Sequence, residues 1–105
     1  MVASAIRFIR DRSGDTVRVD DVLRHVPISR RSLEMRFRRE VGRSLHAEIQ
    51  RAHLERAKQL LAETDLPMPR VAEGSGFGSA SYLGMVFRRE VGMTPAKYRT
   101  HVRSR

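Results

Sequence analysis

The sequence feature that most limits the possible folds is a segment of fifteen residues that occurs twice, fifty residues apart. Positions 28–42 and 78–92 carry the same residue at nine of these fifteen places, and both copies end in Phe-Arg-Arg-Glu-Val-Gly. A repeat at a fixed spacing usually marks one small structural unit that is built twice. Two copies in 105 residues are too few for a repeat solenoid, so the sequence predicts two similar units in one small domain.

Each copy has the pattern of a capped amphipathic helix. Ser29 and Ser79 precede the helical residues as N-caps, and Gly42 and Gly92 are suited to end the helices. At about 100° per residue, the large apolar residues fall within one narrow arc that we expect to face the core. These residues are Leu33, Phe37 and Val41 in the first copy and Leu83, Phe87 and Val91 in the second. The opposite arcs are expected to face outwards, and they carry Arg31, Ser32, Met35, Arg38 and Arg39, and Ser81, Tyr82, Met85, Arg88 and Arg89.

The remaining sequence predicts further helices and no strand, so the expected fold class is all-α. Short helices are predicted over 2–12, from an Asp20 N-cap to Pro27, and over about 69–74. The longest helix is predicted over 45–63 with Ser44 as its N-cap, and a last one starts at Thr94-Pro95. A short helix, a tight turn and a longer capped helix thus occur twice, which is the helix-turn-helix motif in duplicate. The expected parts are a first unit (1–43), a linker helix (44–63) and a second unit (64–105).

The charge of the chain predicts an anionic partner. There are 21 lysines and arginines against 12 acidic residues, which gives a net charge of +9, and only Lys58 and Lys97 are lysines. Arginine suits phosphate and base-edge recognition. Charge alone leaves DNA, RNA, a membrane surface and an acidic protein open. The absence of cysteine excludes disulfides and thiolate metal sites. No apolar run has the length of a membrane span, and no signal-peptide pattern opens the chain, so we expect a cytoplasmic protein.

In a helix-turn-helix, the first turns of the second helix enter the major groove of duplex DNA. On this basis the base-contacting candidates are Arg31, Glu34 and Met35 in the first unit, and Ala80, Ser81 and Met85 in the second. Arginine can pair with guanine, glutamate can accept from cytosine, and methionine can pack on a thymine methyl group. The candidates for phosphate contacts are Arg30, Ser32, Arg38, Arg39, Tyr82, Arg88 and Arg89. The base-contacting candidates of the second unit have small or apolar side chains, which can form few hydrogen bonds to bases. We therefore expect the first unit to discriminate between DNA sequences more strongly.

The second copy and its flanks resemble the DNA-binding domain of the AraC/XylS family of bacterial transcription regulators. The resemblance is carried by Val71–Phe77, Ser79–Leu83, Phe87–Gly92, Thr94-Pro95 and Tyr98-Arg99, with Arg56–Leu61 in the linker, and it covers roughly residues 5–100. Within the family, Ile28–Phe37 and Ser44–Ile49 look most like the xylose-operon regulator branch. Glycine at position 74 and proline at position 27 depart from the family pattern, and Gly74 is expected to weaken its short helix.

The resemblance implies seven helices in two subdomains bridged by the long helix, with recognition helices in two successive major grooves of a double-stranded DNA operator. Family members usually carry a separate effector-binding or dimerisation domain. We therefore expect this chain to be the C-terminal part of a longer regulator, monomeric as an isolated domain, with RNA polymerase as a possible further partner of the regulator.

Other functions receive less support from the sequence. Gly74–Gly78 has no preceding strand and no following Gly-Lys-Ser/Thr, so it is expected to be a turn rather than a phosphate-binding loop. The four histidines lack metal-ligand spacing, and no cofactor, metal or catalytic site is predicted. Two alternatives stay open: a generic basic RNA-binding or nucleoid-type helical protein, and a protein-interaction domain that uses its methionines.

Overall fold

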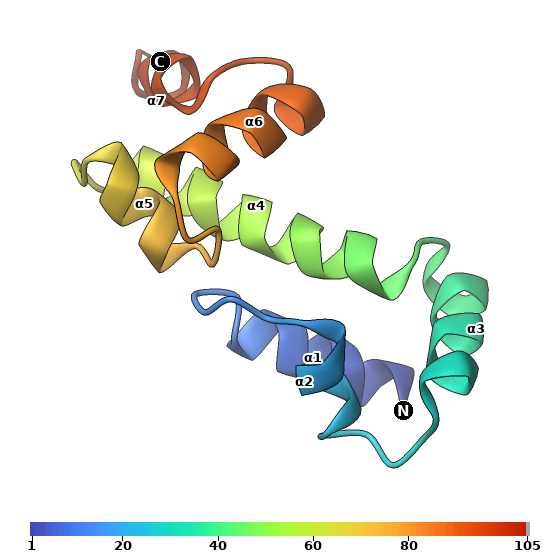
Figure 1. Cartoon of the computed structure of the whole chain (residues 1–105). Coiled ribbons are helices and arrows are strands. Elements are labelled where there is room, and N and C mark those ends of the chain that lie inside the picture. Colours follow the sequence, from blue (N-terminus) through green and yellow to red (C-terminus); the bar gives the residue numbers. More distant parts are fainter. Residues whose placement is uncertain (105) are drawn as a thin grey trace.

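The computed structural model describes residues 1–104, and over this range it contains seven helices and no strand. The helices are α1 (Val2–Asp11), α2 (Val19–Leu23), α3 (Arg30–Val41), α4 (Leu45–Glu63), α5 (Met68–Gly74), α6 (Ala80–Val91) and α7 (Pro95–Arg103). Figure 1 shows α1, α2 and α3 around one half of α4, and α5, α6 and α7 around the other half. The prediction of an all-α fold with two helix-turn-helix units bridged by a long helix is confirmed.

The interior is divided into two apolar clusters that share α4. Leu45 and Ile49 belong to a cluster with α1, α2 and α3. Leu54, Ala57 and Leu61 belong to a second cluster with α5 and α6. The molecule is elongated, with extents of 44 × 22 × 22 Å, as expected for two small cores placed along one helix. Each recognition helix is therefore held by a core of its own.

The ends of the longer helices follow the predicted caps. The hydroxyl of Ser29 accepts from the N–H of Ser32 at 3.2 Å, and that of Ser79 accepts from the N–H of Tyr82 at 3.1 Å. Ser44 and Thr94 cap α4 and α7 in the same way. Gly42 and Gly92 end α3 and α6 with φ of 86° and 88°, a left-handed conformation that glycine adopts without steric cost.

The predicted bounds of the second helix are wrong at both ends. The helix α2 begins at Val19 with Arg18 as its N-cap, because the carboxylate of Asp21 accepts from the Arg18 N–H at 2.9 Å. Asp20 lies inside the first turn instead of capping it. The helix ends at Leu23, four residues before Pro27, since the chain then turns to bury Val26 in the first core.

Gly74 lies at the end of its helix and not in the interior, where the expected cost of a glycine applies. Gly74 is the last residue of α5, where helix propensity matters little. A Cβ atom at this position would lie 3.2 Å from Cδ1 of Leu60 on α4, so the glycine permits close packing of α5 on the linker helix. The following Gly76 and Gly78 have positive φ angles of 86° and 83°, which gives the predicted turn into α6.

Candidate nucleic-acid interface

The outward face of α3 collects the predicted base readers of the first unit. Arg31, Glu34 and Met35 lie together with Arg38 and Arg39 around one open hollow of about 510 Å³. Met35 is 61% exposed, which is unusual for a large apolar side chain. An exposed apolar group between arginines is suited to a surface that packs against another molecule. The other predicted contacts of this helix, Arg30 and Ser32, are exposed as well.

One of these residues already has a partner within the helix. The Oε1 atom of Glu34 accepts a hydrogen bond from Nε of Arg30 at 3.4 Å. Both side chains are about half exposed, and exposed pairs one helical turn apart contribute only a few tenths of a kcal/mol. Glu34 can therefore exchange this partner for a base-edge donor at low cost.

The outward face of α6 is less polar near its start. Ser81 and Met85 are exposed, and Met85 is 56% accessible, whereas Ala80 is half-buried. Tyr82 is 43% exposed, and its ring lies at an angle against Phe77 with centroids 5.8 Å apart. The ring is thus held by Phe77 while the residue stays partly exposed, which suits a polar contact with an anion.

The arginines at the end of α6 are also exposed. Arg89 donates from Nη2 to Oε1 of Gln50 on α4 at 3.3 Å and from Nε to Glu90 at 3.1 Å. These contacts orient Arg89 towards the linker helix, while Arg88 has an open side chain.

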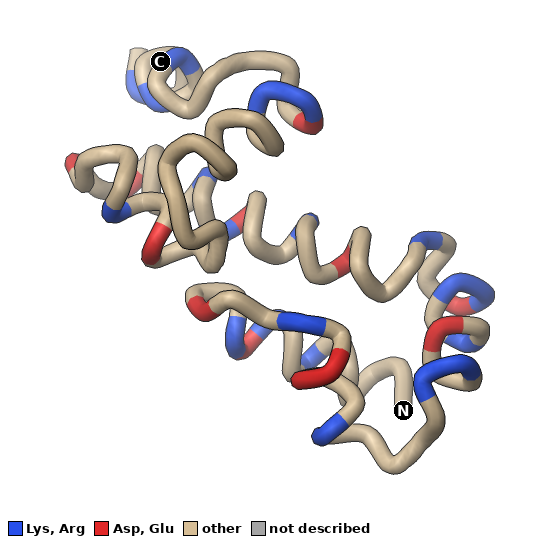
Figure 2. The backbone as a smooth tube through the Cα atoms, viewed as in Figure 1, with Lys and Arg blue, Asp and Glu red and all other residues tan. Residues whose placement is uncertain are grey.

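The two outward faces differ in charge. Figure 2 shows lysine and arginine positions in both halves of α3, but only near the C-terminal end of α6. The sequence of α3 contains five arginines and two glutamates, whereas α6 contains two arginines and one glutamate. The outward face of α3 therefore attracts polyanions more strongly than that of α6.

The inward arcs agree closely with the prediction. Leu33, Phe37, Leu83 and Phe87 are fully buried in their respective cores. The valines at the end of each arc, Val41 and Val91, are half-buried, since each lies in the last turn next to the exposed glycine cap. Sequence periodicity did not identify Val86 and Leu54, which are also buried.

A charged cluster that the sequence analysis missed holds the corner between α3 and α4. The Glu48 side chain is buried, with the residue 5% exposed, and it accepts from Arg43 at 2.6 Å and from Arg51 at 2.8 Å. The hydrogen bond from Arg51 lowers the pKa of Glu48; burial opposes this effect, and Arg43 adds to it. Because Arg43 lies in the connector between α3 and α4, the cluster helps to fix the orientation of α3 relative to α4. The available signal was an acidic residue in the first turn of a helix, with arginines five positions before it and three after it.

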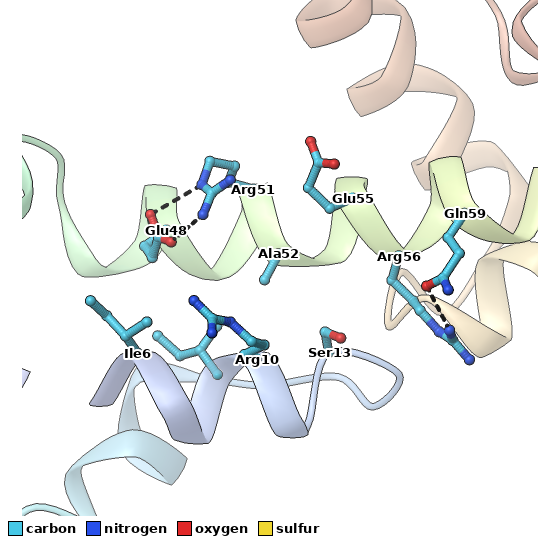
Figure 3. A pocket seen from close by; sticks show the side chains of 10 residues that line it. Ile6, Arg10, Ser13, Glu48, Arg51, Ala52, Glu55, Arg56 and Gln59 are labelled. Atoms are coloured by element: carbon cyan, nitrogen blue, oxygen red, sulfur yellow. Dashed lines mark hydrogen bonds and ion pairs between the residues drawn. The ribbon is translucent and has the colours of Figure 1, made fainter. Parts of the chain in front are cut away.

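Figure 3 shows Glu48 and Arg51 of this cluster at the edge of a cavity between α1 and α4. The cavity has a volume of about 440 Å³ and is lined by Ile6, Arg10, Glu48 and Glu55, among others. Helical spacing places these α4 positions on the opposite side of α4 from His46 and Gln50, which line a smaller cleft beside Tyr82. None of the predicted base or phosphate contacts lines this cavity. No helix within residues 1–104 combines the length and the apolar character that crossing a bilayer would require.

The geometry can be compared with known proteins. A family described as "Helix-turn-helix domain" matches residues 22–101. The xylose operon regulatory protein of Haemophilus influenzae is 36% identical over 99 residues, which are 94% of this chain and 26% of that protein. The protein of the same name from Escherichia coli K12 is 39% identical over 93% of this chain and 25% of its own length. The chain thus spans about a quarter of the length of these curated relatives.

Solved structures show the same arrangement. A structure of the xylose-binding transcription activator XylR has a TM-score of 0.81 and 38% identity, over 91% of this chain and 25% of that one. The DNA-binding domain of AdpA, a global transcriptional factor solved in complex with a target DNA, has a TM-score of 0.91 and 27% identity, over 98% and 93% of the two chains. With two complete helix-turn-helix units on one linker helix and relatives of this kind, the chain belongs to the AraC-type family of helix-turn-helix DNA-binding domains.

Proposed function

We propose that this chain is the operator-reading domain of a longer transcription regulator and inserts α3 and α6 into two successive major grooves of duplex DNA. The observation that carries the proposal is the pair of exposed, N-capped helices, each on its own core and both attached to α4. The similarity to the AdpA domain in its DNA complex supports the same mode of binding.

In the proposed complex, α3 supplies most of the sequence discrimination. Arg31 pairs with a guanine, Glu34 accepts from a cytosine amino group, and Met35 packs on a thymine methyl group. Their grouping around one hollow supports a shared role. In the second unit, Ala80, Ser81 and Met85 approach the bases with one hydroxyl between two apolar groups, so this unit reads shape and methyl positions.

The phosphate contacts of the proposal lie at the edges of these faces. They are Arg30, Ser32, Arg38 and Arg39 on α3, and Tyr82, Arg88 and Arg89 on α6. Arginine and hydroxyl groups neutralise or hydrogen-bond phosphates without regard to base sequence, so these side chains set the register of each helix in its groove.

The difference between the two units has a consequence for the operator. Because α3 and α6 present different side chains, one domain contacts two different boxes, and the operator is asymmetric. A single copy of the domain covers both boxes, so we propose that it binds as a monomer.

The rest of the regulator is part of the same proposal. In it, the first unit (1–43) binds one operator box and the second unit (64–105) binds the other. The linker helix (44–63) joins them. The relatives are about four times as long as this chain, which supports an additional effector-binding domain in the full-length protein. A regulator of this type acts on the chromosome in the cytoplasm, and RNA polymerase is its proposed further partner.

Selection of bound duplexes from a random pool, at two salt concentrations, tests the proposed function. We expect an asymmetric consensus about two helical turns long that persists at the higher salt concentration. A generic RNA-binding or nucleoid-type protein would instead return no consensus, and its affinity for every duplex would fall steeply with salt.

A further inference from the structure

The two helix-turn-helix units touch each other at one face of α4. The segment between α1 and α2 reaches the turn between α5 and α6 beside the linker helix (Figure 1). We call this the inter-unit contact and define it by Ser13, Thr16, Val17, His53 and Gly76.

His53 on α4 is the centre of the inter-unit contact. It is 6% exposed, and both of its ring nitrogens face backbone groups of the first unit. The N–H of Val17 can only donate, so Nε2 accepts from it, at 3.4 Å. The proton is then on Nδ1, which donates to the carbonyl oxygen of Ser13 at 3.0 Å. On its other side the ring meets Phe77 edge-on, with centroids 5.9 Å apart. One side chain thus contacts both units.

Gly76 closes the inter-unit contact from the second unit. The hydroxyl of Thr16 donates to the Gly76 carbonyl oxygen at 3.0 Å, across sixty residues of sequence. A Cβ atom on Gly76 would lie 2.4 Å from the ring of His53 and 2.6 Å from the carbonyl oxygen of Asp15. The turn therefore packs so closely against His53 and Asp15 that no side chain larger than the hydrogen of glycine fits at position 76.

The inter-unit contact lies at a position along α4 where it can restrict bending of the helix. On α4 the first apolar cluster extends to Ile49 and the partly buried Ala52, and the second begins at Leu54, so His53 lies between the two cores. Apolar packing alone is non-directional, and the 19-residue α4, about 28 Å long, can bend. Hydrogen bonds at fixed angles between the units restrict such bending.

We propose that the inter-unit contact is a positioning device that sets the number of base pairs accepted between the two operator boxes. One inserted base pair rotates the second box by about 35° about the duplex axis and moves it by about 3.4 Å. A domain with fixed units rejects that change, whereas a domain with loosely joined units accommodates it. This inference depends on the proposed function, because it assumes that both units bind DNA together.

Two glycines of the same turn give a matched pair of variants. Gly76→Ala places a methyl group against His53 and Asp15, whereas at Gly78 no atom lies within 4 Å of the new Cβ. Both glycines have positive φ angles, of 86° and 83°, so both variants carry similar backbone strain. Thr16→Val removes the hydroxyl that reaches Gly76, and Thr16→Ser keeps it. Thr16→Val also provides the test if Gly76→Ala does not fold.

Binding is measured by fluorescence anisotropy with the selected operator, with operators one base pair longer or shorter between the boxes, and with single boxes. When the spacing between the boxes changes by one base pair, we expect about a tenfold loss of affinity for the unaltered protein, Gly78→Ala and Thr16→Ser. Gly76→Ala and Thr16→Val should lose about twofold or less, with unchanged affinity for single boxes. A folded Gly76→Ala or Thr16→Val protein that keeps the tenfold penalty would overturn the proposal.

A measurement without DNA separates this inference from the proposed function. The chain has no cysteine, so Met35→Cys and Met85→Cys place two spin labels on the exposed faces of α3 and α6. Gly76→Ala should broaden the distance distribution between the labels, and Gly78→Ala should not. An unchanged distribution in Gly76→Ala contradicts the positioning role. If the distribution broadens but selection returns no consensus, the inter-unit contact does restrict the motion of the units, and the proposed function is wrong.

Discussion

The carboxylate of Glu48 lies 2.6 Å from Nη1 of Arg43, so a buried acid on the linker helix holds the connector that follows the first recognition helix. Arg51 donates to the same carboxylate from the next turn of α4. The arginine heads are partly open to solvent while the acid is not, which makes Glu48 the fixed member of the cluster.

The first prediction concerns acid stability. The hydrogen bonds from Arg51 and Arg43 lower the pKa of Glu48 in the folded protein, so its stabilising contribution is complete above about pH 5 and is lost as the pH falls through the lowered value. Glu48→Gln should reduce the free energy of unfolding at pH 7 by about 1.5–3 kcal/mol. Thermal melts from pH 7 to pH 2.5 should show the two proteins converging at low pH.

Asp65 serves as the internal reference for that experiment. Its pKa is also lowered, by the hydrogen bond from Arg103, and we expect Glu48→Gln to leave this shift unchanged because neither Glu48 nor its arginine partners are among its causes. The difference between the two melting curves therefore reports on Glu48. A difference that does not depend on pH would contradict the assignment.

The second prediction separates core from surface in α6. Phe87 is fully buried and packs edge-on against Tyr98, so Phe87→Ala should cost about 3–5 kcal/mol of stability. Met85, two residues earlier, is exposed, and Met85→Ala should stay within about 0.5 kcal/mol of the unaltered protein. Chemical denaturation measures both, and equal midpoints would show that Phe87 is not part of the core.

The third prediction uses two glycines of one helix. Gly84 lies inside α6 with no atom within 4 Å of a new Cβ, so Gly84→Ala should stabilise the protein by about 0.5–1 kcal/mol. Gly92 ends the same helix at a φ of 88°, and Gly92→Ala should cost about 1–2 kcal/mol. Thermal denaturation should shift in opposite directions, and shifts of the same sign would contradict this reasoning.

The fourth prediction tests base reading by Arg31. Arg31→Ala should cost about 1–3 kcal/mol on the selected operator and relax the preference at one position. Arg56→Ala is the charge-matched control, because Arg56 lines the cavity between α1 and α4 and is not a predicted DNA contact. Binding to operator variants is the measurement. A uniform loss over all sequences would make Arg31 a phosphate contact.

The fifth prediction tests phosphate contact by Arg88. Arg88→Ala should weaken binding to all duplexes about equally and reduce the slope of log affinity against log salt concentration by about 1. Titrations at four salt concentrations give the slope. An unchanged slope would remove Arg88 from the interface.

The sequence predicts most of this fold because its signals are local. Ser29, Ser44 and Ser79 mark helix starts through hydrogen bonds to residues three positions ahead, and the spacing of Leu33 and Phe37 reflects one helix facing one core. The family resemblance supplies the arrangement of the seven helices, and the family and fold agree with it.

What the sequence does not reveal depends on contacts between distant residues or on unusual caps. Arg18 replaces the expected Asp20 as N-cap because the Asp21 side chain reaches back to its backbone N–H. In the sequence His53 looks like any surface or interhelical histidine. Its contacts come from Ser13, forty residues before it, and from Gly76, 76 − 53 = 23 residues after it. The predicted base and phosphate contacts lie on exposed faces, apart from Ala80, which is half-buried, and Glu34, which is partly exposed. Their roles stay predictions.

Under the proposed function, the division of the interior into two apolar clusters also affects how a regulator with this domain can change over generations. A substitution on the outer face of α3 leaves the packing around Phe87 untouched, and one on α6 leaves that around Phe37 untouched. In the proposed complex, each half of the operator preference can therefore drift separately. A mutant regulator can acquire a new first box while it still recognises the old second box, so intermediate forms keep part of their binding throughout.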